Sequence, residues 1–260
     1  MQLGTILLTN LLAISIAMGI LWIVATWLRD LSIVDIFWGL GFVFVTWLSL
    51  LMAKQTLLSD WLLVTIVTLW GLRLAGYLAW RNLGKPEDYR YRAMRERNGR
   101  GFAVVSLFTV FGLQGLLLWI ISLPLQVGAT RAQSWHVGMA IGVAFWAIGL
   151  FFETTGDLQL ARFKANPANR DQVMNRGLWQ YTRHPNYFGD FLVWWGIYFV
   201  TVERSSWWWT IISPLLMSFL LVRVSGVRLL EDSLKHRVAG YEEYVRTTSS
   251  FFPLPPKKSF

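Results

Sequence analysis

The sequence predicts an all-α membrane protein with about seven transmembrane helices. Of its 260 residues, 55% are hydrophobic and only 15% are charged, whereas soluble domains have roughly 25% charged residues. The chain also contains 16 Trp and 17 Phe, an aromatic load typical of the belts at membrane–water interfaces. Most basic residues fall between long apolar runs. Together these observations indicate an integral, multi-pass membrane protein.

Seven segments are apolar and close to the roughly 17–25 residues that a spanning helix needs. They cover residues 4–28, 31–53, 61–80, 102–123, 135–152, 187–202 and 206–222. The first continues for about 20 residues with no basic residue before it, which predicts a membrane span and not a cleaved signal peptide. The sixth is short and carries Asp190, so it fits the spanning pattern least well.

The basic residues of the connections alternate along the chain. The connections at 81–100 and 153–185 and the C-terminal segment are rich in Arg and Lys, whereas the second, fourth and sixth connections contribute only Lys54, Arg131 and Arg204. Positive connections stay in the cytosol. The alternation therefore predicts an N-terminus outside and a C-terminus in the cytosol, and we expect the bacterial inner membrane.

The composition excludes several kinds of chemistry. The chain has no cysteine, which rules out disulfides, thiolate nucleophiles and Cys-ligated metals. Its three histidines have no metal-ligand spacing, so no metal is expected. There is no GxGxxG after a strand and no Walker loop, so a dinucleotide would be bound without a Rossmann domain. The net charge of +9 lies in the connections, which favours membrane orientation and an anionic ligand over nucleic acid.

Polar residues within spans two to four suggest a cavity. Asp35 lies about one turn into span two, Arg73 about two turns from the cytosolic end of span three, and Gln114 midway along span four. One interpretation is a cavity open to the cytosol, with Trp38, Arg73 and Gln114 as substrate contacts and Tyr77 nearby. The alternative is that Asp35 and Arg73 pair only to fix helix packing, as intramembrane charges usually do.

The segment 153–170 combines an acid with cations. Asp157, Ala161 and Lys164 fall on successive turns of one helical face, and Arg162 and Arg170 lie close in sequence. Such a set suits a nucleotide, because the acid can meet base or ribose hydroxyls while the cations meet phosphates. A plain cytosolic basic patch is the alternative.

The segment 177–190, GLWQYTRHPNYFGD, is the most informative part of the chain. It places Arg183, His184, Asn186, Tyr187 and Asp190 within eight residues, at the edge of an apolar span. Polar groups are costly there and usually serve a ligand or partner. We expect Arg183 to contact a phosphate. Asn186 and Asp190, spaced i, i+4, would contact an amide such as a nicotinamide carboxamide.

The C-terminal segment from Arg223 offers further ligand candidates. Arg223, Glu231, Tyr241 and Tyr244 lie near the membrane end or on one aromatic edge. The alternative is an amphipathic helix at the interface.

Taken together, these three segments resemble the steroid 5-alpha-reductase family, and 177–190 is very similar to sterol reductases that reduce ring double bonds with NADPH. The resemblance is strong over 153–256 and weaker over spans two and three. It implies one transmembrane domain, 1–260, in which 1–152 holds a lipid substrate and 153–260 holds NADPH. The implied cofactor contacts are Asp157, Lys164, Arg170, Tyr181, Arg183, His184, Asn186, Tyr187, Asp190, Arg223 and Glu231.

The resemblance also implies hydride transfer to the conjugated C=C of a 3-oxo-delta-4 steroid or a similar lipophilic enone. In that family a carboxylate on span two and a tyrosine on span three contact the keto oxygen, which makes Asp35 and Tyr77 the expected catalytic residues. Trp70 could occupy the tyrosine position, and Val34-Asp35 stands where the family has Gln-Glu. A protonated Asp35 would donate to the developing enolate.

Two other classes remain open. Isoprenylcysteine carboxyl methyltransferases and phospholipid methyltransferases have a similar Arg-His-Pro-x-Tyr-x-Gly element that serves S-adenosylmethionine, but a cationic donor does not need the Arg162, Lys164 and Arg170 ladder. A transporter or lipid-binding scaffold would often show an internal repeat, and none is evident. The expected partners are a lipophilic small molecule and membrane lipids, with no obligate protein partner.

Overall fold

The computed structural model describes residues 2–53, 58–128, 135–170, 172–202, 205–224 and 240–257, and within these ranges it contains helices and no strands. The all-helical prediction is therefore confirmed for the described part of the chain. The chain divides into two compact units. Unit 1 comprises Met1–His136 and Thr201–Thr210, and unit 2 comprises Val137–Val200 and Ile211–Phe260.

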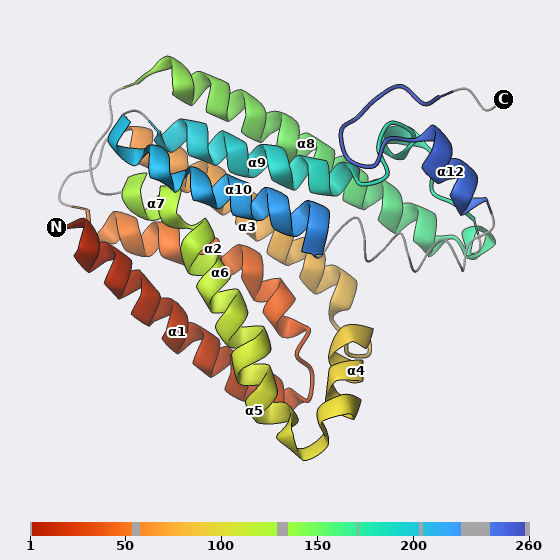
Figure 1. The fold of residues 1–260 in the computed structure, drawn as a ribbon, viewed down its shortest axis with the longest axis horizontal. Helices are drawn as coiled ribbons and strands as arrows, with labels where there is room; N and C mark the ends of the chain where they lie inside the picture. Colours follow the sequence, from red (N-terminus) through yellow and green to blue (C-terminus); the bar gives the residue numbers. More distant parts are fainter. Residues whose placement is uncertain are drawn as a thin grey trace. The chain divides into compact units, whose positions relative to one another are not determined.

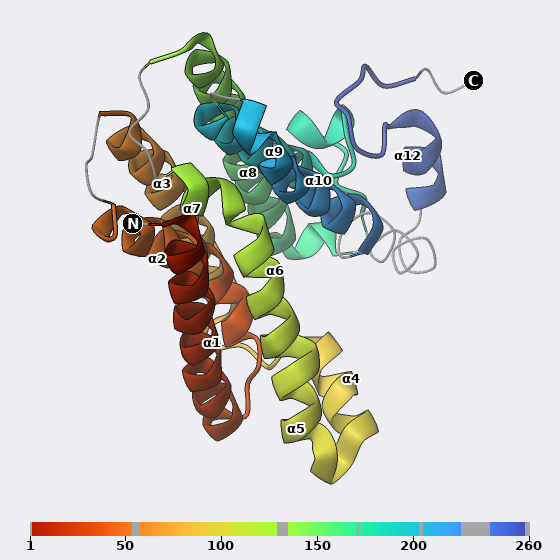
Figure 2. The same cartoon turned by 60° about the vertical axis from the view of Figure 1, so that its left-hand side comes forward.

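Unit 1 is a bundle built around the hairpin of α2 and α3 (Figures 1 and 2). Its elements are α1 (Leu3–Leu28), α2 (Ile33–Leu51), α3 (Leu58–Asn82), α4 (Tyr89–Asn98), η1 (Gly99–Gly101), α5 (Phe102–Ser106), the π-helical segment η2 (Leu107–Gly112), α6 (Leu113–Ile121) and α7 (Leu123–Gly128). The helix from α4 turns sharply at η1 before α5 begins (Figure 2).

Close backbone contact holds α2 against α3. A Cβ built on Gly39 would lie 2.5 Å from the Gly71 carbonyl oxygen, so only glycine allows this approach. Phe42 and Trp70 are fully buried beside it, with ring centroids 5.8 Å apart. The α2–α3 hairpin therefore has a tightly packed core.

Unit 2 is organised by α8 (Val137–Ala165) and α9 (Pro185–Thr201). Its shorter elements are η3 (Pro167–Asn169), η4 (Gly177–Gln180), α10 (Ile212–Phe219), the π-helical η6 (Leu220–Val224) and α12 (Tyr241–Thr247). The 3-10 helix η5 (Ser205–Ile211) belongs to unit 1 up to Thr210. Glycines bring α8 and α9 together at two levels. A Cβ on Gly142 would lie 2.6 Å from the Gly196 carbonyl oxygen, and one on Gly149 would lie 2.5 Å from that of Gly189.

Replacing Gly149 with Ala should lower the free energy of unfolding by about 1–3 kcal/mol, because the new methyl group would meet backbone atoms that cannot move aside. Gly76→Ala is the matched control, since a Cβ there has no heavy atom within 4 Å. Thermal unfolding in detergent measures both. Equal midpoints for the two variants would contradict the close α8–α9 approach.

Five helices are long and apolar enough to cross a membrane: Leu3–Leu28, Ile33–Leu51, Leu58–Asn82, Tyr89–Ile121 and Val137–Ala165. They coincide with the first five expected spans, so a membrane protein is indicated by structure as well as by sequence. The sixth expected span is α9, with 17 residues, or about 25 Å of helix against a hydrocarbon core of about 30 Å. The seventh is the shorter apolar helix Trp207–Arg223. A count of seven and the orientation of the termini stay predictions.

One helix, α8, extends well beyond its predicted span. It continues from the expected end at 152 to Ala165, because no proline or glycine pair interrupts it before Pro167. As a consequence, Asp157 and Lys164 stand on the same helix as the apolar span. The boundary between the two compact units falls before α8, and the division into a substrate half and a cofactor half at 152/153 stays a prediction.

Candidate functional site

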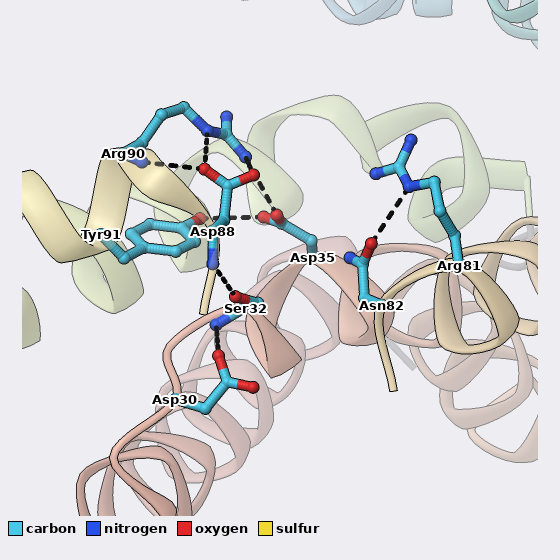
Figure 3. Close-up of polar contacts among 8 residues, drawn as sticks. All are labelled: Asp30, Ser32, Asp35, Arg81, Asn82, Asp88, Arg90 and Tyr91. Carbon is cyan, nitrogen blue, oxygen red and sulfur yellow. Dashed lines mark hydrogen bonds and ion pairs between the residues drawn. The ribbon is translucent and has the colours of Figure 1, made fainter. Parts of the chain in front are cut away.

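Asp35, in the first turn of α2, accepts two hydrogen bonds from α4 (Figure 3). The Tyr91 hydroxyl donates to Asp35 Oδ1 at 2.9 Å, and Arg90 Nη2 donates to Oδ2 at 3.1 Å. Tyr91 is buried, whereas the Arg90 side chain is 46% exposed. Both oxygens of Asp35 therefore act as hydrogen-bond acceptors in this arrangement.

The loop before α4 fixes this arrangement. Asp88 caps α4 by accepting from the Arg90 backbone N–H and from Arg90 Nε, each at 2.9 Å. The Asp88 N–H in turn donates to Ser32 Oγ at 2.9 Å, and the Ser32 N–H donates to Asp30 Oδ1 (Figure 3). Burial alone would raise the pKa of the Asp88 carboxyl, but the hydrogen bonds and charge of Arg90 outweigh it and hold that pKa below its ordinary value. Asp88 is thus an anion at neutral pH, and it locks Arg90 in place.

A second ion pair fixes the far side of α4. Arg95 Nη2 donates to Glu87 Oε1 at 2.8 Å, and the same oxygen accepts from the Leu31 N–H at 3.0 Å. Arg95 also donates to the Arg29 carbonyl and lies over the Phe102 ring, 4.2 Å from its centroid. The loops at 29–32 and 83–88 are thereby joined by charged groups at two points.

Gln114 belongs to the same cluster. Its side chain lies close to Tyr91, two residues after the π-helical segment Leu107–Gly112. π-helical turns often mark functional sites. The structure therefore places Asp35 and Gln114, two of the residues selected from sequence, near the same tyrosine, Tyr91.

The other residues selected in unit 1 lie around aromatic rings. The Arg73 guanidinium lies 5.5 Å from the Tyr77 ring centroid, and that of Arg81 lies 5.7 Å from it. Trp38 packs edge-on against Phe42 at 5.3 Å. Arg90, and not Arg73, is the cation that pairs with Asp35.

Sequence reasoning missed Arg90 and Tyr91. Both lie in the basic connection at 81–100, which looked like a topological signal alone. One clue was present: Tyr91 and Arg95 are four residues apart and so share a helical face, opposite the exposed positions of α4. Their partners, Asp35 and Glu87, could not be paired with them from periodicity.

In unit 2, Asp157 and Asn186 are brought together across the α8–α9 contact. Asn186 Nδ2 donates to Asp157 Oδ1 at 3.1 Å, and Asp157 is only 5% exposed. His184 stacks on Tyr187 with ring centroids 5.4 Å apart and planes 7° apart. Four residues expected at the cofactor therefore lie close to the start of α9.

Arg183 is turned toward the C-terminal segment. Its Nη1 donates to the carbonyl oxygens of Val245, at 3.1 Å, and Thr248, and its backbone N–H donates to Ser249 O. The Tyr244 hydroxyl donates to the Trp179 carbonyl from the same segment. In this geometry Arg183 and Tyr244 hold residues 241–257 against the 177–190 motif, and their contacts with NADPH stay predictions.

The remaining expected cofactor residues differ in exposure. Lys164, Arg170, Tyr181 and Arg223 are exposed, Asp190 is half-buried, and Tyr241 is buried with its ring 5.8 Å from that of Tyr244. Glu231 lies outside the described residues. Among the described residues no group of three or more His, Cys, Asp or Glu could hold a metal ion.

The comparisons with known proteins give one result. The family model DUF1295, described as a protein of unknown function, matches residues 21–248. No curated protein and no solved structure matches the chain significantly. The family match spans helices of both units and far more than half of the sequence, so the chain belongs to the DUF1295 family.

Proposed function

We propose that this protein is a membrane-embedded, NADPH-dependent reductase that transfers a hydride to the conjugated C=C of a lipophilic enone, such as a 3-oxo-delta-4 steroid. The observation that carries the proposal is the Asp157–Asn186 pair beside the His184–Tyr187 stack. These groups come from segments 29 residues apart, and they are the ones that the likeness to NADPH-dependent reductases singles out.

The residues of unit 2 fit a dinucleotide in their chemistry. A buried carboxylate and an amide offer acceptors and donors for ribose hydroxyls or a carboxamide. The flat His184–Tyr187 stack suits an aromatic base. Lys164 and Arg170 are exposed cations, and cations at such positions bind phosphates that remain partly in water. Arg183 is left out of this set because its guanidinium holds the C-terminal carbonyls.

For the substrate we propose Tyr91 as the hydrogen-bond donor to the ligand carbonyl and Asp35 as its positioning partner. The tyrosine hydroxyl needs only to rotate from Asp35 toward that carbonyl. This replaces Tyr77, whose ring lies beneath two guanidinium groups. Asp35, ion-paired to Arg90, acts as an acceptor.

The reaction balances in electrons and protons. Bound NADPH would supply a hydride, that is, two electrons and one hydrogen, to the β-carbon of the enone. Negative charge then develops on the carbonyl oxygen, where the Tyr91 hydroxyl stabilises it. The α-carbon takes up one proton from water as the enolate collapses, and Tyr91 ends in its neutral form.

Thermal unfolding of the purified protein with NADPH, NADH or S-adenosylmethionine tests the cofactor class. NADPH at a hundredfold excess over Kd should stabilise the folded state by about 2.7 kcal/mol. The shift should weaken in Lys164→Ala and Arg170→Ala, and it should be unchanged in Lys257→Ala, an exposed cation at the far end of the C-terminal segment. Stabilisation by S-adenosylmethionine alone would make the protein a methyltransferase and end the reductase proposal.

A further inference from the structure

The charges on α4 are sorted between two faces. Within residues 81–100 the acids Glu87 and Asp88 both face inward, where they pair with Arg95 and Arg90. Tyr91, also on the inner face, is buried. Two of the three acids of this segment, Glu87 and Asp88, are therefore already paired with arginines of α4.

The outward face of α4 and the turn η1 that follows it are strongly basic. Arg92 and Arg97 on α4 and Arg100 in η1 are exposed, and none of them forms an ion pair among the described residues. Glu96 is the one acid of this segment that accompanies them. We call Arg92, Arg97 and Arg100 the α4 basic face.

Exposed aromatic side chains occur on α4 and on neighbouring helices of unit 1. Trp27 at the end of α1 is 80% exposed, Trp80 near the end of α3 is 68% exposed, and Tyr89 at the start of α4 is 60% exposed. The end of α1 is tied to α4, because Arg95 donates to the Arg29 carbonyl next to α1. Large aromatic side chains next to cations are typical of a membrane–water interface.

We propose that the α4 basic face binds the phosphates of anionic phospholipid headgroups. Three guanidinium groups attract a surface of negative phosphates, and exposed aromatic side chains on the same unit suit the headgroup region. The Glu87–Arg95 and Asp88–Arg90 pairs hold α4 in place, so the cations are ordered before the lipid arrives and less conformational entropy is lost on binding. This binding is independent of the proposed reductase activity.

The test uses the full-length protein purified in an uncharged detergent. Phosphatidylglycerol and phosphatidylcholine with the same acyl chains are titrated in, and binding is measured by native mass spectrometry and by thermal unfolding. We expect the intact protein to prefer phosphatidylglycerol. Each cation removed should weaken that binding by about fivefold, so R92Q/R97Q/R100Q should weaken it by more than tenfold and leave phosphatidylcholine binding unchanged.

The matched control is R162Q/R176Q/K257Q, which removes the same charge from exposed positions of unit 2. It should keep the preference for phosphatidylglycerol. Equal losses in both triple variants would show that only net charge matters and would overturn the proposal. So would equal binding of the two lipids by the intact protein, or an equal response to free glycerol phosphate, which would indicate a soluble anion as the ligand.

Discussion

Replacing Tyr91 with Phe should reduce enone turnover by about a hundredfold or more, while the apparent Kd for NADPH stays unchanged. The Tyr91 hydroxyl is the buried donor beside Asp35. Removing a single donor to a developing oxyanion typically costs about 10²–10³ in kcat. The phenyl ring would keep its packing, so the folded state should lose little beyond one hydrogen bond. NADPH oxidation and product formation, measured with a panel of 3-oxo-delta-4 steroids, would report the turnover.

Tyr89→Phe is the matched control, because Tyr89 lies on the same helix and is exposed. It should retain full turnover. Tyr77→Phe tests the assignment suggested by sequence alone and should also retain most of the activity. If Tyr77→Phe lost turnover while Tyr91→Phe kept it, the roles would have to be exchanged. If neither variant lost turnover, the carbonyl would need another donor.

The fold was predictable from sequence because it depends on local properties. Apolar runs long enough to span are read directly from the chain, and five of them became helices of sufficient length. Helix ends were less predictable. α8 passes its apolar limit by more than three turns because residues 158–165 are mostly good helix formers. The arginine-rich helix α4 was not predicted, and the fourth span begins only after the turn at η1, at Phe102, where it was expected.

The site was predictable only where the partners lie close in sequence or in a recognisable motif. The 177–190 segment identified His184, Asn186 and Tyr187, and a carboxylate on the preceding helix was a natural partner. The Asp35–Tyr91 hydrogen bond joins residues 56 positions apart. No periodicity connects them, because the hydrogen bond depends on how two loops meet. The ion pairs within residues 81–100 could not be predicted either, because the sequence does not show that Glu87 lies beside Arg95 and Asp88 beside Arg90.

Replacing Arg183 with Met should destabilise the protein by at least about 2 kcal/mol. The Arg183 guanidinium, 7% exposed, is the donor to the carbonyl oxygens of Val245 and Thr248. Each acceptor that loses its donor while buried costs about 1–3 kcal/mol. Methionine fills similar volume, so packing changes should be small. Thermal unfolding gives the stability, and limited proteolysis should show faster cleavage within residues 241–257, because that segment loses its anchor.

Arg176→Met provides the comparison, since Arg176 is exposed and lies in the same stretch of chain. It should leave stability and proteolysis unchanged. The two possible roles of Arg183 predict opposite patterns. An anchoring arginine gives a less stable protein whose intact fraction binds NADPH at low and high salt with nearly the normal Kd. A phosphate-binding arginine gives a stable protein with a raised Kd, and less dependence of that Kd on salt, because one charge-assisted contact is gone. The second pattern would return Arg183 to the cofactor site and leave the docking of the C-terminal segment to Tyr244 and Thr182, whose hydroxyls donate to Trp179 O and Phe251 O.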